Sequence, residues 1–98
     1  MIKIRECHKL KTWQPYFDDI ASGKKTFDIR KDDRNFQVGD SLLLLEWSPE
    51  KENYTGLFLH FEVIYKLDGG KFGLEEGYHC LNIKLIPNEK EHIQNETT

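Results

Sequence analysis

The stretch of this sequence best equipped for chemistry lies in its first third, where polar and apolar side chains alternate. Thr26, Asp28 and Arg30 alternate with Phe27 and Ile29, which is typical of a β-strand with two unlike faces. We expect the apolar pair to face the core, and the hydroxyl, carboxylate and guanidinium to share the opposite face. An Arg–Asp pair in register can bind phosphate or a base edge, although an exposed strand with cross-strand ion pairs has the same pattern.

Two lysines precede this strand and follow a glycine that can end a helix. Lys24 and Lys25 would leave the helix beside the strand, where they could hold phosphate. Trp13 or Tyr78 could stack a base. Trp13 has the alternative role of packing the helix against the sheet. The candidate ligand-binding residues are Lys24, Lys25, Thr26, Asp28, Arg30, Trp13 and Tyr78.

A short helix and several strands must position these residues. Pro15 is suited to a first helical turn and Gly23 to a left-handed stop, so we predict one helix of about two turns. Its core stripe is predicted to contain Tyr16, Phe17, Ile20 and Ala21. Strands are predicted over residues 1–6, 26–31, 41–47, 57–67 and 78–86, with residues 7–12 leading out of the first.

Hydrophobic patterning assigns faces to the later strands. Residues 41–47 form a nearly continuous apolar run, typical of a strand buried on both faces, and should pair with the next strand through a hairpin. Phe36 is predicted to anchor a charged loop to the core, before a tight turn over residues 37–40. One face of the segment 57–67 should contain Leu57, Leu59, Phe61, Val63 and Tyr65.

These elements predict a strand-rich α+β fold, a small mixed β-barrel of about five strands, closed or nearly closed, with one covering helix. The 98 residues allow a single domain over residues 1–86, followed by a polar C-terminal tail over residues 87–98. No apolar run approaches the roughly 20 residues of a membrane span, and the N-terminal residues lack a signal-peptide pattern. We therefore expect a cytoplasmic protein with no membrane partner.

Charge is distributed unevenly along the chain. The net charge is −3, but residues 1–40 contain nine Lys or Arg and seven Asp or Glu, whereas residues 41–98 contain five and ten. A phosphate-bearing ligand requires at least a local basic surface. The residues that could form it are Lys9, Lys11, Lys24, Lys25, Arg30, Lys31 and Arg34.

The dipeptides Cys7-His8 and His79-Cys80 contain a permissible zinc ligand set. Adjacent strand residues point to opposite faces, so neither dipeptide easily offers both side chains to one ion. We expect no metal site, no cofactor and reduced cysteines.

An ordered series of motifs across residues 3–85 resembles the ASCH domain of the PUA-like superfamily, closest to its small uncharacterised bacterial and phage branch. The motifs are His8-Lys9-Leu10-Lys11, Ser22-Gly23-Lys24-Lys25-Thr26, Phe27-Asp28-Ile29-Arg30, Phe36-Gln37-Val38-Gly39-Asp40, and Asp68-Gly69-Gly70 with Phe72-Gly73-Leu74. The resemblance implies a PUA-like barrel with a cleft lined by the Gly-Lys-Lys-Thr segment and the Arg-bearing strand. It also implies recognition of RNA or of a modified nucleotide.

One ASCH subgroup hydrolyses the acetyl group of N4-acetylcytidine with a Lys base, a Thr nucleophile and a downstream Glu. The resemblance puts that lysine at Lys25, but Asp28 occupies the position of the nucleophile. A carboxylate does not simply replace an alkoxide in attack on an amide. The glutamate could be Glu62, Glu75 or Glu76.

Three functions follow from the sequence. The first is an RNA- or nucleotide-binding module. The second is an amidohydrolase acting on acylated cytidine, with Lys25 as general base and Asp28 orienting a water molecule or the substrate amine. The third is a protein-interaction module that uses an exposed acidic face around Glu46, Glu50, Glu52 and Glu62.

Overall fold

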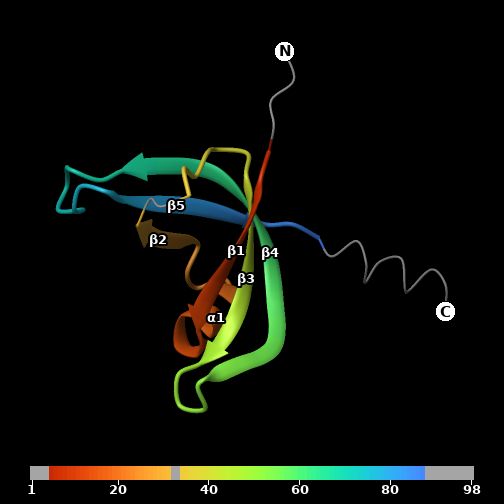
Figure 1. The fold of residues 1–98 in the computed structure, drawn as a ribbon. Coiled ribbons are helices and arrows are strands. Elements are labelled where there is room, and N and C mark those ends of the chain that lie inside the picture. Colours follow the sequence, from red (N-terminus) through yellow and green to blue (C-terminus); the bar gives the residue numbers. More distant parts are fainter. Residues whose placement is uncertain (1–4, 32–33, 88–98) are drawn as a thin grey trace.

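The computed structural model describes residues 5–31 and 34–87. Its elements are β1 (Cys7–Trp13), α1 (Gln14–Ala21), β2 (Phe27–Lys31), β3 (Ser41–Ser48), β4 (Asn53–Asp68) and β5 (Tyr78–Leu85) (Figure 1). No helix within these residues is long and apolar enough to span a bilayer. The predicted strand-rich α+β class, with five strands and one helix, is confirmed for this part of the chain.

The five strands form one sheet in the order β1-β3-β4-β5-β2. β1 is parallel to β3, and the other three pairs are antiparallel. Figure 1 shows a strongly curled sheet in which the long β4 takes part in both halves, so that β5 and β2 run across β1 and β3. The sheet is a half-barrel rather than a closed barrel, because β1 and β2 remain its two edges.

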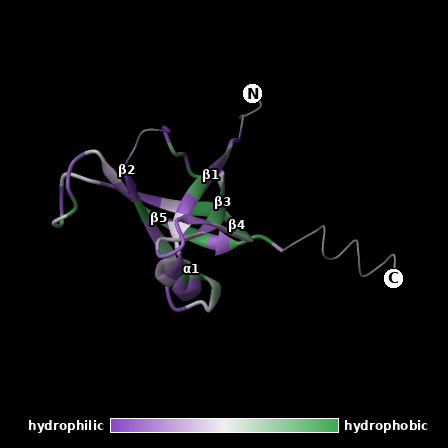
Figure 2. Cartoon of the chain, turned by 60° about the horizontal axis from the view of Figure 1, so that its bottom comes forward, coloured by the Kyte–Doolittle hydropathy of each residue, from purple (hydrophilic) through white to green (hydrophobic). Residues whose placement is uncertain are grey.

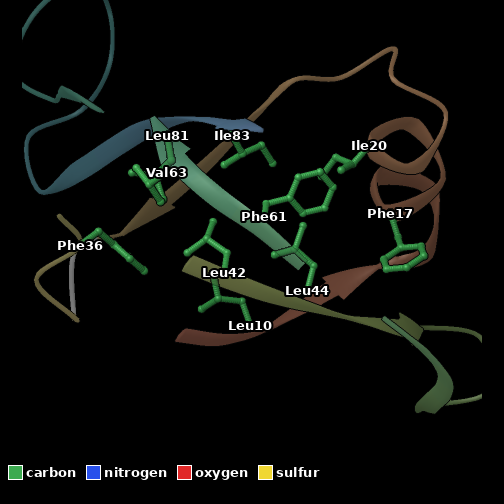
Figure 3. Close-up of a cluster of buried hydrophobic side chains, with 10 residues drawn as sticks. All are labelled: Leu10, Phe17, Ile20, Phe36, Leu42, Leu44, Phe61, Val63, Leu81 and Ile83. Carbon is green, nitrogen blue, oxygen red and sulfur yellow. The ribbon is translucent and has the colours of Figure 1, made fainter. Parts of the chain in front are cut away.

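The core lies inside the curl, where the strands and α1 contribute their buried apolar side chains (Figure 3). In Figure 2 hydrophobic stretches mark β3 and β4, and the loops contain mainly hydrophilic residues. The predicted hairpin is confirmed, because Leu42 pairs with Phe61 and Leu44 with Leu59. The core residues are Leu10, Phe17, Ile20, Phe36, Leu42, Leu44, Phe61, Val63, Leu81 and Ile83.

The predicted helix is confirmed, with a proline in its first turn and Gly23 at a φ of +86° just beyond its end. Its predicted core stripe is wrong for half of its members. Phe17 and Ile20 are buried, but Tyr16 and Ala21 are exposed. The main packing partners of α1 are β1 and β3, at one side of the helix, so a narrow stripe is sufficient.

The prediction of a strand over residues 1–6 is wrong where it can be compared with the structure. Residues 1–4 lie outside the described residues, residues 5 and 6 are not in a strand, and the first strand begins at Cys7. Residues 7–12, predicted to lead out of a strand, form most of β1. The inward positions of β1 are His8, Leu10 and Thr12, so only one of them supplies the apolar signal of a buried face.

The predicted faces of β2 are inverted. Phe27 and Ile29 are 40% and 46% exposed, whereas Asp28 is 5% exposed and Arg30 is partly buried. β2 is an edge strand, so its inward face borders the opening of the half-barrel instead of its packed centre. Polar side chains that pair with one another can occupy that position.

The predicted apolar face of β4 is confirmed at Phe61 and Val63 but is wrong at Leu57 and Tyr65, which are exposed. The pairing register shifts twice along β4, between Leu45 and Trp47 of β3 and again between Val63 and Tyr65. Such irregularities change which residues of a strand face inward. β3 is buried on one face and only half-buried on the other, so the prediction of burial on both faces is also wrong.

The turn before β3 is built as the sequence predicted. Phe36 is fully buried, and Gly39 has a φ of +99°. The Asp40 carboxylate accepts hydrogen bonds from the backbone amides of Gln37 at 3.0 Å and Glu6 at 3.2 Å. This turn therefore joins the entry of β1 to the entry of β3.

Candidate functional site

An open pocket of about 410 Å³ lies between the two edges of the sheet, where the end of β1 and the start of α1 face β2. Its volume is within the range of small-molecule sites. The curl of the sheet makes this pocket, because β1 and β2 are at opposite ends of the strand order. The lining residues are Lys11, Thr12, Trp13, Tyr16, Lys25, Phe27, Asp28, Ile29 and Arg30.

A buried carboxylate organises the polar side of the pocket. Asp28 accepts a hydrogen bond from Arg30 Nε at 2.7 Å through Oδ2, and its Oδ1 lies 3.7 Å from Lys25 Nζ. Charge-assisted contacts of this kind hold a guanidinium in a fixed orientation. Asp28 therefore compensates part of the positive charge and fixes where the remaining arginine donors point.

Arg30 also links the two sheet edges. Its Nη2 donates a hydrogen bond to Thr12 Oγ1 on β1 at 3.0 Å. A guanidinium has five N–H donors, and within the described residues no contact engages Nη1. Arg30 thus retains donors for a ligand while Asp28 and Thr12 hold its position.

Aromatic side chains surround this polar floor. The rings of Trp13, Tyr16 and Phe27 are all substantially exposed at the pocket. Lys25 Nζ lies 5.5 Å from the centroid of the Tyr16 ring and 5.0 Å from that of Phe27, within the range of cation–π attraction. The pocket can therefore offer flat apolar surfaces and positive charge to one ligand.

The structure brings four of the seven sequence-predicted ligand residues to this pocket, namely Trp13, Lys25, Asp28 and Arg30. Lys24 and Thr26 are exposed and do not line it. Tyr78 lies on β5 opposite Lys31 of β2, outside the pocket lining. Lys24, Thr26 and Tyr78 thus lie outside the lining of this pocket, and the binding of one ligand by all seven residues stays a prediction.

Of the predicted basic surface, Lys11, Lys25 and Arg30 line the pocket. The ammonium of Lys11 lies 3.9 Å from the centroid of the Trp47 ring, and Arg34 Nη1 donates to the Lys9 carbonyl at 2.8 Å. The positive charge nearest to Asp28 thus comes from Lys25 and Arg30.

Sequence reasoning missed Thr12 and Tyr16. Thr12 follows His8 and Leu10 at the two-residue spacing of a strand, a signal hidden by the assignment of residues 7–12 to a connection. The helical spacing predicts Tyr16 on the core face of the helix, but it is exposed and lines the pocket. Both errors concern the wall of the pocket opposite β2.

The structure also changes the expectations for the glutamates. Glu62, Glu75 and Glu76 are exposed and do not line the pocket. Glu46, predicted to contribute to an exposed acidic face, is buried and accepts a hydrogen bond from Thr55 Oγ1 at 2.5 Å. The prediction of an exposed acidic face that includes Glu46 is therefore wrong.

The two Cys-His dipeptides separate as strand geometry requires. His8 is buried, with Nε2 at 2.9 Å from Asp40 Oδ2, and Cys7 is exposed, with Sγ at 3.8 Å from His60 Nε2. His79 Nδ1 lies 2.9 Å from Asp68 Oδ1. Within residues 5–31 and 34–87 no three potential metal ligands form a group, and the expectation of no metal stays a prediction.

The chain is 48% identical over 44 residues to an uncharacterized 12.9 kDa protein in the GpA 3′ region of Escherichia phage P2. That match covers 45% of this chain and 40% of the phage protein, so the chain spans less than half the length of this relative. A model of the family described as "Domain of unknown function (DUF3850)" matches residues 7–83, a range that contains every strand except the end of β5. The chain therefore belongs to the DUF3850 family.

Proposed function

We propose that this protein is an ASCH-type, PUA-like module that binds a nucleotide or an unpaired base of RNA in the pocket between β1 and β2. The observation that carries the proposal is the Arg30 guanidinium, held by Asp28 and Thr12 beneath an exposed aromatic rim. The sequence resemblance to ASCH domains supports the same function.

In this proposal the base lies against the exposed rings of Trp13, Tyr16 or Phe27, because aromatic stacking accepts any base. Arg30 donates to acceptor atoms of the base edge, and Asp28 accepts from an exocyclic amine. Lys25 attracts the phosphate from the rim of the pocket.

The amidohydrolase alternative needs an activated hydroxyl beside the lysine. Thr26 is exposed and outside the pocket lining, whereas Thr12 lines it and accepts a hydrogen bond from Arg30. Lys25 Nζ lies 3.7 Å from the Asp28 carboxylate, so its neighbour in the pocket is an ion-pair partner and not a hydroxyl. These contacts favour binding over hydrolysis.

The Arg30→Ala variant tests the proposed function. Loss of a charge-assisted contact should weaken the binding of ribonucleoside monophosphates by about tenfold to a hundredfold, measured by calorimetric or NMR titration. Lys51→Ala, which removes an exposed charge from the β3–β4 turn, is the control and should bind like the wild type. Equal binding by the wild type and Arg30→Ala, with both folded by circular dichroism, would contradict the proposal.

The Lys25→Ala variant separates binding from catalysis. If Lys25 contacts phosphate, the variant binds short single-stranded RNA more weakly, and the slope of log affinity against log salt falls by about one. If Lys25 is a general base, release of acetate from N4-acetylcytidine disappears while binding is retained. We expect the first result, and turnover by the wild type that is lost in Lys25→Ala would establish the alternative.

A further inference from the structure

The convex side of the half-barrel presents a second surface beside the pocket, formed by β2, β5 and the C-terminal half of β4. The pairing register aligns Phe27 of β2 with Asn82 of β5 and Tyr65 of β4. The next row aligns Ile29, Cys80 and Leu67, and the last pairs Lys31 with Tyr78. We call these eight residues the outer face.

Strand alternation explains why the outer face is open to solvent. The neighbouring residues Asp28, His79, Leu81 and Val63 are buried on the inner side, so the residues between them point outward. The helix α1 packs against β1 and β3, on a different part of the sheet. Within the described residues nothing covers Phe27, Ile29 and Tyr65, each of which is at least 40% exposed.

Exposed aromatic and aliphatic side chains gathered on one sheet face are a candidate interaction site. Its charges favour one class of partner. Lys31 belongs to the face, and Lys84 lies at its border, where it is paired in register with Glu62. A partner with exposed apolar rings and negative charge fits this composition.

The outer face is also continuous with the pocket. Phe27 and Ile29 line the pocket and belong to the first two rows of the face. A ligand that leaves the pocket over Phe27 and crosses the strands therefore meets Asn82 and then Tyr65, whereas Tyr78 lies two rows away, opposite Lys31. Neighbouring strands lie about 4.8 Å apart, so Phe27 and Tyr65, two strands apart, are separated by roughly 10 Å, a span that two successive nucleotides can cover.

We propose that the outer face is a stacking surface along which a single strand of nucleic acid runs out of the pocket. The inference rests on the proposed function, since the pocket would hold one nucleotide of that strand. Tyr65 and Tyr78 stack the bases that follow it, and Lys31 contacts the backbone. The face gives affinity that increases with strand length, whereas the pocket alone determines binding of a mononucleotide.

The two native cysteines allow a test on the unmodified protein. Cys80 lies at the centre of the outer face, and Cys7 is exposed on β1, an edge strand that does not belong to the face. A saturating 12-nucleotide single strand, as RNA or DNA, should slow alkylation of Cys80 by N-ethylmaleimide by about tenfold or more, as expected for a site occupied more than 90% of the time. Cys7 should react at an unchanged rate. Equal rates at Cys80 with and without the bound 12-mer would overturn the proposal.

A pair of variants tests the same face through affinity. Tyr65→Ala and Tyr78→Ala should each weaken binding of the 12-mer by about tenfold, as expected for one lost stacking contact, and should leave mononucleotide binding unchanged. Tyr54→Ala is the matched control, since Tyr54 is on the same strand as Tyr65 and similarly exposed, at 51% against 60%, but lies outside the face. Unchanged 12-mer affinity in both test variants would overturn the proposal.

These outcomes separate this inference from the proposed function. If the pocket is not a nucleotide site, the wild-type protein binds no mononucleotide. If the outer face is not a stacking surface, the affinity for the 12-mer does not depend on Tyr65 and Tyr78. A second copy of the chain would instead shield Cys80 without any oligonucleotide. A concentration-dependent dimer that Tyr65→Ala dissociates would likewise overturn the nucleic-acid assignment.

Discussion

Replacing Phe61 by alanine is expected to lower the free energy of unfolding by about 3 to 5 kcal/mol. Phe61 is 5% exposed at the centre of the core and is flanked in the sheet by Leu42 of β3 and Leu85 of β5. Figure 3 shows its ring between Leu44, Ile83 and Ile20 of the helix. Truncation therefore leaves a cavity where both halves of the sheet meet α1, and urea unfolding monitored by circular dichroism measures the loss.

The matched control is Phe58→Ala. Phe58 is in the same strand but is 53% exposed, so its truncation should change the free energy of unfolding by about 1 kcal/mol or less. The comparison holds residue type and strand constant and varies burial. Equal losses in the two variants would contradict the position of Phe61 at the centre of the core.

The core was predictable because its signal is local and repetitive. The apolar run of β3 and the alternation through Phe61 and Val63 of β4 predict two paired strands without information from other segments of the chain. Phe36 and the turn at Asp40 were likewise predictable, because an apolar residue followed by a Gly-Asp pair is a strong turn signal.

The orientation of β2 was not predictable from alternation alone. The pattern from Thr26 to Arg30 defines two faces, but it does not state which face points inward. The usual rule puts Phe27 and Ile29 inside, and it fails here because the inward side of an edge strand borders a pocket. The polar side chains of Asp28 and Arg30 are tolerated there since they satisfy each other.

The candidate site was predictable only on the side that β2 supplies. β1 and β2 are close in sequence but occupy opposite ends of the sheet, and the curl that brings Thr12 to Arg30 depends on all five strands. No periodicity within residues 7–13 contains that information. The same reasoning applies to Tyr78, whose strand pairs with β2 but whose row faces the outer side of the sheet.

The second large effect is expected from Asp40→Ala, which should lower the free energy of unfolding by about 3 to 5 kcal/mol. The Asp40 and His8 side chains are 4% and 5% exposed, and His8 Nε2 lies 2.9 Å from Asp40 Oδ2. The variant also removes the acceptor of the Glu6 and Gln37 amides. Three donors would lose their partner at once, and the loss is largest at His8, which is buried and would be left without a partner.

Asp68→Ala is the matched control for this prediction. Asp68 Oδ1 is also 2.9 Å from a histidine, His79, but the Asp68 side chain is 61% exposed. An exposed carboxylate stays hydrated in the folded state and its ion pair is screened by water, so this variant should lose about 1 kcal/mol or less. Losses of similar size in both variants would show that burial does not determine the contribution of the Asp40 pair.

The stabilisation by Asp40 should also depend on pH. Burial acts to raise the pKa of Asp40, but hydrogen bonds from His8 and from the amides of Glu6 and Gln37 outweigh burial and hold that pKa below its ordinary value. A carboxyl whose pKa is lower in the folded state contributes stability above its unfolded pKa of about 4, and that contribution is lost as the pH falls below this value.

The Asp40→Asn variant keeps one acceptor oxygen but cannot ionise. The difference in free energy of unfolding between the wild type and Asp40→Asn should therefore be constant near neutral pH and shrink below about pH 4. A difference that stays the same at pH 3 and pH 7 in urea titrations would mean that the ionised form of Asp40 is not what the folded turn stabilises.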